Sequence, residues 1–245
     1  MIFLAGFVDS IAGGGGLVSL PTYYMVGLPP HLALGTNKFS SSIGTAASTV
    51  EYLRGGHIYK KLIAVSVIGA LTGSTVGAQC ALFLDESVLR VIMLVLLPVL
   101  AVFTIIKKDL LEPKEQQQHL KWEQIIALVM SLVVGWYDGF FGPGTGTFLM
   151  LGFVGLLHLN PITACGNTKV VNLCSNIAAL LTFVLNGAIF YNLAIPCAVF
   201  SILGHYIGAR TNIKNGAKLI KPVLLLVIVL LMLTIGRDVF IAKTA

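Results

Sequence analysis

The sequence predicts an all-α fold: a polytopic transmembrane helical bundle of two inverted-topology repeats, each with a glycine-broken helical hairpin and three spanning helices. Composition, long apolar stretches and an internal repeat predict it. Of the 245 residues, 56% are apolar and 11% are charged, against about a quarter charged in an ordinary soluble domain. The mean hydropathy is +0.91. Ten acidic and sixteen basic residues cannot cover a soluble surface of this size. Soluble globular, disordered and disulfide-scaffold proteins are therefore excluded.

The first element along the chain is an apolar segment at 1–28, which four glycines interrupt at 13–16. A matching segment at 122–160 is interrupted by Gly-Pro-Gly-Thr-Gly at 142–146. Its arm at 124–137 has 14 residues, or about 21 Å of helix, which is shorter than a hydrocarbon core of about 30 Å. We expect each segment to form a hairpin of two short helices with its glycine tip inside the membrane. Two short full crossings remain the alternative.

The other apolar stretches are each long enough to cross a bilayer as a helix, which takes about 20 residues. A single long polar segment at 107–121 separates the two halves of the chain and predicts a linker. The predicted domains are therefore a first repeat at 1–106, this linker, and a second repeat at 122–245. The predicted spanning helices lie at 33–53, 62–84, 88–106, 164–185, 193–210 and 219–241.

The two halves resemble each other in sequence. Asp9 matches Asp138 at an offset of 138 − 9 = 129, and Lys38 matches Lys169 at an offset of 169 − 38 = 131. A constant offset through glycines and a lysine is not expected from chance similarity between apolar helices, which is the alternative. The second offset also relates Pro30 to Pro161, Gly35 to Gly166, Gly56 to Gly187, Gly73 to Gly204 and Gly77 to Gly208.

The basic residues of equivalent loops predict opposite orientations for the two halves. The loop at 54–61 carries three Lys and Arg residues and its counterpart at 185–192 carries none, whereas 79–90 carries one and 210–221 carries four. Because basic loops stay in the cytoplasm, equivalent loops are expected to face opposite sides, with the linker cytoplasmic. This is the pattern of inverted repeats in secondary transporters. Random scatter of a few charges is the alternative.

The glycine tips are the first candidate substrate site. A helix that begins after a tip has free N–H groups and a positive dipole end, and two such ends meeting near the repeat axis favour an anion. Glycine lets an anion approach the backbone closely. The alternative is that these glycines only permit tight packing. The candidate residues are Gly14, Gly15, Gly16, Gly144, Thr145 and Gly146.

Two lysines in the first turns of apolar helices are the second candidate. Lys38 and Lys169 are costly there unless they face the interior or reach an interface, and reaching an interface is the alternative. A lysine ammonium can hold an oxyanion. Polar residues beside the lysines, on the same helices, add hydrogen bonds to the predicted substrate site: Asn37, Thr168, Asn172 and Asn176.

Asp9 and Asp138 lie four residues before the glycine tips and are candidate ion-coupling residues, since intramembrane carboxylates are often ion or proton sites. They could instead accept hydrogen bonds from backbone near the break or pair with a lysine. His205 and Glu51 lack counterparts of their own type, so a loop or packing role is expected for them. The four cysteines are expected to be packed thiols. No metal-ligand spacing or catalytic motif is present, so neither a cofactor nor an enzymatic activity is expected.

Four motifs carry a resemblance to a known family: Ala-Gly-Phe-Val-Asp-Ser-Ile-Ala-Gly-Gly-Gly-Gly at 5–16, Thr-Asn-Lys at 36–38, Tyr-Asp-Gly-Phe-Phe-Gly-Pro at 137–143 and Gly-Ala-Arg at 208–210. They resemble the sulfite exporter TauE/SafE family over nearly the whole chain, and are most similar to its bacterial inner-membrane branch. That resemblance implies ion-coupled export or uptake of small sulfur-containing anions such as sulfite or sulfonates, by a multi-pass protein of the cell inner membrane. Relatives usually carry more apolar residues before the first motif, so the first arm, of twelve residues, is expected to be incomplete.

The sequence therefore predicts a transporter that works by alternating access. Its expected partners are a small anionic substrate, the lipid bilayer and a coupling ion, for which a proton and sodium are the candidates. Nucleic acid is not expected despite the net charge of +6, because the basic residues are dispersed in short loops. The alternatives are an anion channel of the same architecture, a non-transporting membrane assembly subunit, and an intramembrane enzyme, for which no nucleophile–base pair is found. The sequence leaves the oligomeric state open.

Overall fold

A computed structural model describes residues 1–89, 91–92, 95–96 and 122–215, and over this part the regular structure is entirely helical. The predicted linker at 107–121, most of the predicted span at 88–106 and the predicted span at 219–241 lie outside the described residues. The helices are α1 (Ile2–Ala12), α2 (Gly16–Met25), α3 (Pro30–Arg54), α4 (Lys60–Phe83), α6 (Glu123–Phe140), α7 (Thr145–Gly155), α8 (Pro161–Leu185) and α9 (Tyr191–Asn215).

Within the described part, three helices are long and apolar enough to cross a membrane, namely α4, α8 and α9. The helix predicted at 33–53 is present as α3, which has 25 residues, but it is not apolar enough to count with them. The reason is its composition: a row of Ser and Thr residues and the charged residues Lys38, Glu51 and Arg54 replace apolar ones. Most of these polar side chains are buried, so α3 is a central helix of the bundle.

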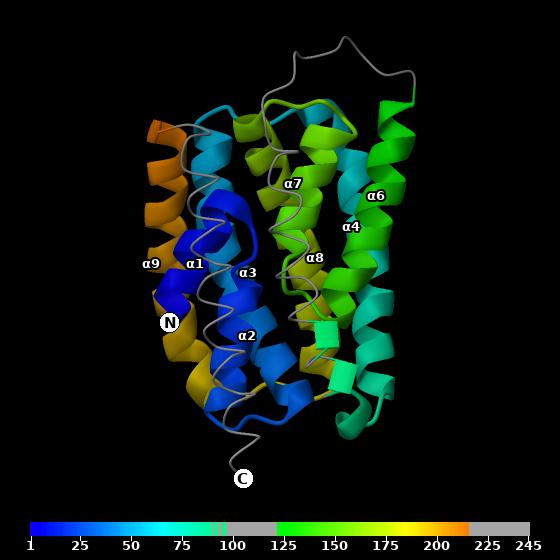
Figure 1. The fold of residues 1–245 in the computed structure, drawn as a ribbon, viewed down its shortest axis with the longest axis vertical. Helices are drawn as coiled ribbons and strands as arrows, with labels where there is room; N and C mark the ends of the chain where they lie inside the picture. Colours follow the sequence, from blue (N-terminus) through cyan, green and yellow to red (C-terminus); the bar gives the residue numbers. More distant parts are fainter. Residues whose placement is uncertain (90, 93–94, 97–121, 216–245) are drawn as a thin grey trace.

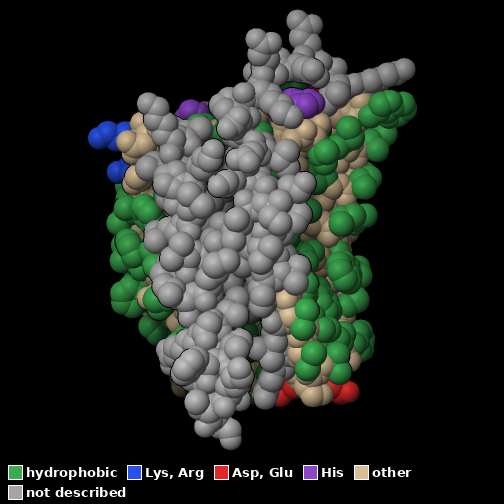
Figure 2. Space-filling view, viewed as in Figure 1, with side chains coloured by type: hydrophobic (Ala, Val, Ile, Leu, Met, Phe, Trp, Pro, Cys, Tyr) green, Lys and Arg blue, Asp and Glu red, His purple; other side chains and the backbone are tan. Residues whose placement is uncertain are grey.

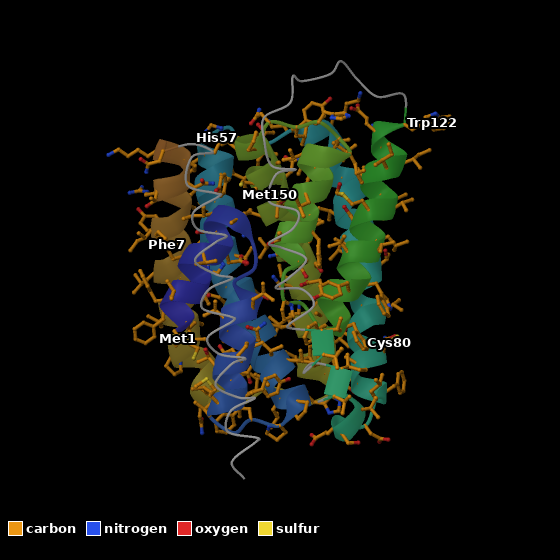
Figure 3. The ribbon with its side chains drawn as sticks, in the orientation of Figure 1. Met1, Phe7, His57, Cys80, Trp122 and Met150 are labelled. Atoms are coloured by element: carbon orange, nitrogen blue, oxygen red, sulfur yellow. The ribbon has the colours of Figure 1, made fainter. Side chains whose placement is uncertain are left out.

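The surface of the bundle is apolar along its flanks and charged at its ends (Figure 2). Large apolar side chains in the middle of helices, such as Ile68 of α4 and Val199 of α9, are exposed on the flanks, as expected for surfaces that face lipid. His57 and Trp122 lie at the upper end (Figure 3). The basic residues of the α3–α4 connection lie at the same end as those of the last turns of α9, because an ion pair joins Arg210 of α9 to Glu51 in the last turn of α3.

Each half supplies a helix that packs against the other half. The helix α6 packs against α4, α1 packs against α9, and α3 packs against both α8 and α9. Close contact depends on glycine, since a side chain on Gly73 or Gly77 of α4 would overlap backbone of α6, and one on Gly204 or Gly208 of α9 would overlap backbone of α1. Small residues play this role widely in membrane helix pairs.

The central helices α3 and α8 run in opposite directions (Figure 1). Near the start of α3, the hydroxyl of Thr36 accepts a hydrogen bond from the N–H of Phe190, which follows α8, at 3.1 Å. Near the start of α8, the amide oxygen of Asn167 accepts one from the N–H of Tyr59, which follows α3, at 2.8 Å. The two contacts are reciprocal, because 36 + 131 = 167 and 59 + 131 = 190.

Both glycine breaks form hairpins, as predicted. The first hairpin joins α1 to α2 and the second joins α6 to α7, and both turns lie within the height of the bundle rather than at its ends (Figure 1). Gly13 has φ of 72° and Gly144 has φ of 85°, values that glycine adopts without strain. The first arm of the second hairpin is longer than predicted, because α6 has 18 residues and continues to Phe140.

Candidate functional site

Two buried ion pairs join the halves of the chain. Lys38 Nζ lies 2.8 Å from Asp138 Oδ2, and Lys169 Nζ lies 2.7 Å from Asp9 Oδ2. Each lysine is 1% exposed and pairs with the aspartate of the opposite half. The two lysines therefore do not reach a membrane interface. Pairing with a lysine was one of the alternatives for the two aspartates, and both aspartates form such a pair.

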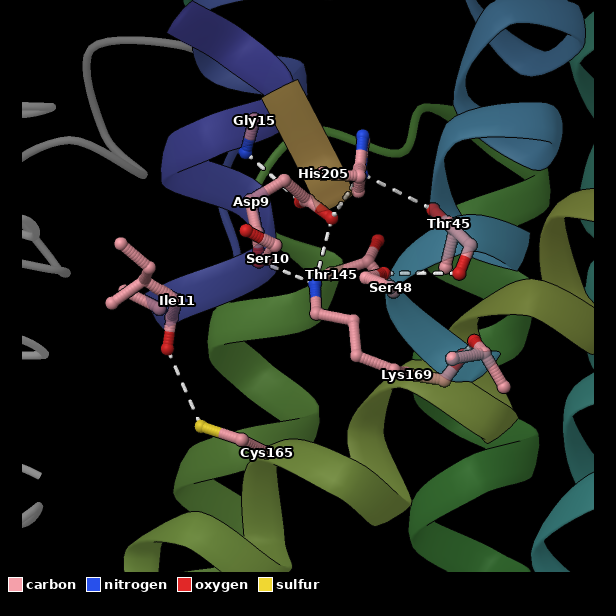
Figure 4. Close-up of polar contacts among 12 residues, drawn as sticks. Asp9, Ser10, Ile11, Gly15, Thr45, Ser48, Thr145, Cys165, Lys169 and His205 are labelled. Atoms are coloured by element: carbon pink, nitrogen blue, oxygen red, sulfur yellow. Dashed lines mark hydrogen bonds and ion pairs between the residues drawn. The ribbon is translucent and has the colours of Figure 1, made fainter. Parts of the chain in front are cut away.

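Three helices meet at Asp9, and we call Asp9, Lys169 and His205 the Asp9 site (Figure 4). Asp9 Oδ1 accepts a hydrogen bond from the N–H of Gly15 at 3.0 Å, and Lys169 Nζ donates to both Asp9 Oδ2 and the Asp9 backbone oxygen. His205 Nε2 lies 3.2 Å from Asp9 Oδ2, and its Nδ1 lies 2.9 Å from the backbone oxygen of Ser201. The packing role expected for His205 is thus incomplete, since it contacts the carboxylate directly.

We call Asp138, Lys38, Ser175 and Asn176 the Asp138 site. Lys38 Nζ donates to Asn176 Oδ1 at 2.9 Å. Ser175 Oγ donates to Asp138 Oδ2 at 2.6 Å. A carboxylate and an ammonium taken out of water are tolerated only when further hydrogen bonds satisfy them, and neutral side chains of α8 supply those bonds here.

The two glycine tips touch each other, as predicted. A side chain on Gly13 would overlap the backbone of Gly146, and one on Gly16 would come within 2.9 Å of Pro143 Cα. The expectation of free N–H groups is wrong for part of the first tip. The N–H of Gly15 is bound to Asp9, and the N–H of Leu17 donates to the Gly14 carbonyl. The expectation is also wrong for Thr145 of the second tip, whose N–H donates to the Gly142 carbonyl, because each turn satisfies its own amides.

A small pocket lies between the two sites, with about 30 Å³ open to water-sized molecules, enough for about two waters. Gly14, Thr168 and Lys169 do not line it, and Lys169 acts on it only through Asp9. The pocket is also lined by polar residues that were not among the predicted site residues, among them Ser19, Ser41, Thr45 and His205. The predicted residues that line it are Asp9, Gly15, Gly16, Asn37, Lys38, Asp138, Gly144, Thr145, Gly146, Asn172 and Asn176.

Within the described residues, one buried polar atom of the pocket lining has no hydrogen-bond partner. Asn172 is 5% exposed, and its buried Oδ1 accepts no hydrogen bond within the described part of the chain. Thr168 Oγ1 is also buried without a partner among the residues that the structure describes, but Thr168 lies outside the pocket. Asn37 differs from both, because its Oδ1 accepts a hydrogen bond from Ser19 Oγ at 2.6 Å. An unpaired buried acceptor is costly, so Asn172 Oδ1 is open to a hydrogen bond donated by a water molecule or by a hydroxyl of a ligand.

Comparison with known proteins identifies related sequences over most of the chain. Residues 1–235 match the family model described as "Sulfite exporter TauE/SafE". A Sinorhizobium sp. protein named "Probable membrane transporter protein ORF9" is 35% identical over 96% of this chain and 90% of its own length. A Haemophilus influenzae "Probable membrane transporter protein" is 34% identical over 91% and 87%, and Escherichia coli K12 "Probable membrane transporter protein YfcA" is 34% identical over 91% and 82%. These names indicate membrane transport and no catalytic activity. No solved structure matches the chain.

Proposed function

The chain belongs to the sulfite exporter TauE/SafE family of membrane transporters, and from this premise we propose that it is a secondary transporter for a small oxyanion, working by alternating access. One observation carries the proposal: two buried Lys–Asp pairs, each joining opposite halves, flank one small polar pocket beside the contacting glycine tips. Buried charges within membrane helices are costly and mark substrate and ion pathways.

The proposal includes an inverted-topology repeat, with halves at 1–106 and 122–245 and a cytoplasmic linker at 107–121 in the inner membrane. It is supported by the opposite directions of α3 and α8, by the reciprocal hydrogen bonds of Thr36 and Asn167, and by the exchanged packing of α1 on α9 and α6 on α4. In such folds the substrate site lies between the repeats, near the middle of the membrane.

The anion would bind by replacing a carboxylate as the partner of a lysine. Lys38 can turn from Asp138 toward an oxyanion in the pocket, with the side-chain amides of Asn172 and Asn176 donating hydrogen bonds to it. Each Lys–Asp pair joins the two halves, so exchanging its carboxylate for a ligand loosens that joint and favours a change in their relative position. The family description points to sulfite, or another small sulfur-containing oxyanion, as the substrate.

The proposal is tested by ligand-dependent stability of the purified protein. A bound ligand raises the melting temperature by mass action, so sulfite, thiosulfate, sulfate, methanesulfonate and a carboxylate are compared. We expect at least one sulfur oxyanion to stabilise the wild type and to lose this effect in the Lys38→Met/Asp138→Asn double variant, which keeps the pocket neutral. Lys60→Met, on the exposed end of α4, is the matched control. Stabilisation by none of these anions, or full stabilisation of the double variant, contradicts the proposal.

Flux into proteoliposomes separates transport from conduction. A transporter accumulates the anion uphill when a coupling gradient is imposed, whereas the channel alternative gives fast downhill flux that no gradient drives uphill. We expect saturable, slow flux with uphill accumulation, and channel-like flux would replace the proposal.

A further inference from the structure

The ring of His205 has both nitrogens against hydrogen-bond acceptors. Its Nδ1 lies 2.9 Å from the backbone oxygen of Ser201, which can only accept, so Nδ1 carries a hydrogen. Its Nε2 lies 3.2 Å from Asp9 Oδ2, a carboxylate oxygen that also accepts from Lys169. A hydrogen bond between Nε2 and Oδ2 requires a proton between them. It is either on the imidazole of His205, with Asp9 ionised, or on Asp9, with the imidazole neutral.

Both arrangements contain the same number of protons. The reference state is an ionised Asp9, a protonated Lys169 and a neutral His205. In either arrangement, the Asp9 site holds one proton more than this reference state. The remaining polar neighbours of the ring are the neutral hydroxyls of Thr45, 3.5 Å from Nε2, and Ser201, 3.3 Å from Nδ1. The charged groups facing it are Asp9 and Lys169, so the Asp9 site has a net charge of +1 with the extra proton and zero without it.

The Asp138 site lacks such a group. The position equivalent to His205 is 205 − 131 = 74, and Ser74 donates its hydroxyl hydrogen to the Ser175 backbone oxygen at 2.6 Å. The additional partners of this ion pair are the neutral side chains of Ser175 and Asn176. The charges of Lys38 and Asp138 cancel, so this site contributes no net charge in either protonation state of the Asp9 site.

We infer that the coupling ion is a proton, that it is held between His205 and Asp9, and that it enters the pocket together with a monovalent oxyanion, as proton–anion symport. This inference rests on the proposed function. With the proton bound, the five charged and titratable groups of the two sites sum to +1, and a monoanion brings the loaded pocket to zero. Without it, the same anion leaves a net charge of −1 buried in the protein, which is costly in a membrane interior. Proton and anion therefore bind cooperatively, and the neutral loaded form is the one that changes conformation.

The first test measures coupling in proteoliposomes with methanesulfonate, a probe whose charge is constant with pH. For one proton per anion, we expect accumulation on the alkaline side of up to about tenfold per pH unit, with matching proton uptake reported by a pH-sensitive dye. His205→Gln is expected to lose the accumulation and to slow methanesulfonate exchange strongly, because its anion-loaded pocket has a net charge of −1, like that of the unprotonated wild type. His31→Gln is the matched control, because His31 contacts the Ala81 backbone oxygen away from the pocket, and it is expected to accumulate normally.

Three outcomes overturn the inference: full pH-driven accumulation by His205→Gln, accumulation on the acidic side, or accumulation driven by sodium alone. If the wild type neither transports methanesulfonate nor is stabilised by any of the oxyanions, the proposed function fails instead. Even then, the position of the proton can be tested by spectroscopy on a variant that keeps His205.

The second test locates the proton spectroscopically. The other four histidines are replaced by Gln, and the ring nitrogens of His205 and the carboxyl carbon of Asp9 are isotopically labelled for solid-state NMR in lipid at pH 7. We expect either two protonated ring nitrogens with an ionised Asp9, or a neutral ring with a protonated Asp9. A bare Nε2 facing an ionised carboxylate overturns the inference.

Discussion

The Asp9 site and the Asp138 site are built on the same plan and differ in their third partner. In both, a lysine near the start of a central helix pairs with an aspartate just before a glycine tip of the opposite half. At Asp9 the third partner is the titratable ring of His205, whereas at Asp138 it is the hydroxyl of Ser175. The Asp9 side chain is 12% exposed and that of Asp138 only 2%. The shared part joins the halves, and the part that differs is the observation from which we infer proton exchange at one site.

The largest expected effect compares the loss of each lysine. Lys38→Met leaves Asp138 buried without its cation, a change that costs about 3–5 kcal/mol and lowers the melting temperature by about 10 °C. Lys169→Met is expected to cost less, because His205 still donates to Asp9. Thermal unfolding in lipid nanodiscs at pH 7 measures both. Lys60→Met serves as the control with no change, and an equal or larger loss in Lys169→Met would show that His205 does not support the Asp9 charge.

The second prediction concerns the contact that both sites share. Gly13→Ala is expected to destabilise the protein by about 2–4 kcal/mol, because overpacking against Gly146 adds to the strain of a positive φ. Gly27→Ala is a matched control, since Gly27 also has a positive φ, of 82°, but nothing lies within 4 Å of a Cβ added there. It is expected to cost only about 1–2 kcal/mol. Melting temperatures and oxyanion flux are compared. Similar losses in the two variants would contradict a functional role for tip contact.

Much of this comparison was accessible from the sequence. The internal repeat identified both lysines and both aspartates, and the glycine runs identified both hairpins. The cross-pairing of Lys38 with Asp138 and of Lys169 with Asp9 was not accessible, because it depends on how α3 and α8 cross in space. A repeat predicts equivalent residues, but it does not say whether a residue contacts its own half or the other one.

The features that sequence reasoning missed have physical reasons. His205 was assigned to packing because its repeat equivalent is Ser74, yet it lies on the glycine face of α9, beside Gly204 and Gly208, and a polar residue on such a face was the available signal. The predicted end of the first arm of the second hairpin was too early. A glycine such as Gly139 often marks the end of a helix. Here Gly139 lies within α6, where it allows close contact with the backbone of α4 at Ser74.

A smaller effect is expected at the neutral partner of the Asp138 site. Ser175→Ala removes a hydrogen bond to a charged group, worth about 1.5–3 kcal/mol. If the two sites have the separate roles argued above, the variant lowers stability and changes oxyanion affinity while the number of protons moved per anion stays the same. Melting temperature, methanesulfonate affinity and dye-reported proton uptake are measured together. A changed proton-to-anion ratio would show that the Asp138 site also takes part in coupling.

The smallest effect on stability, with a clear effect on binding, is expected at Asn172. Because its Oδ1 has no hydrogen bond to lose within the described part of the chain, Asn172→Ala is expected to change the free energy of unfolding by about 1 kcal/mol or less. A hydrogen bond from its amide to a bound anion is worth about 1.5 kcal/mol or more, so oxyanion affinity is expected to fall about tenfold. Thr168→Val is the matched control, since Thr168 Oγ1 is equally unpaired but lies outside the pocket. The affinities come from ligand-dependent melting curves. If Thr168→Val weakens binding as much as Asn172→Ala does, the anion does not bind in the pocket between the two ion pairs. The difference between the Asp9 site and the Asp138 site then cannot explain how anion binding is coupled to a proton.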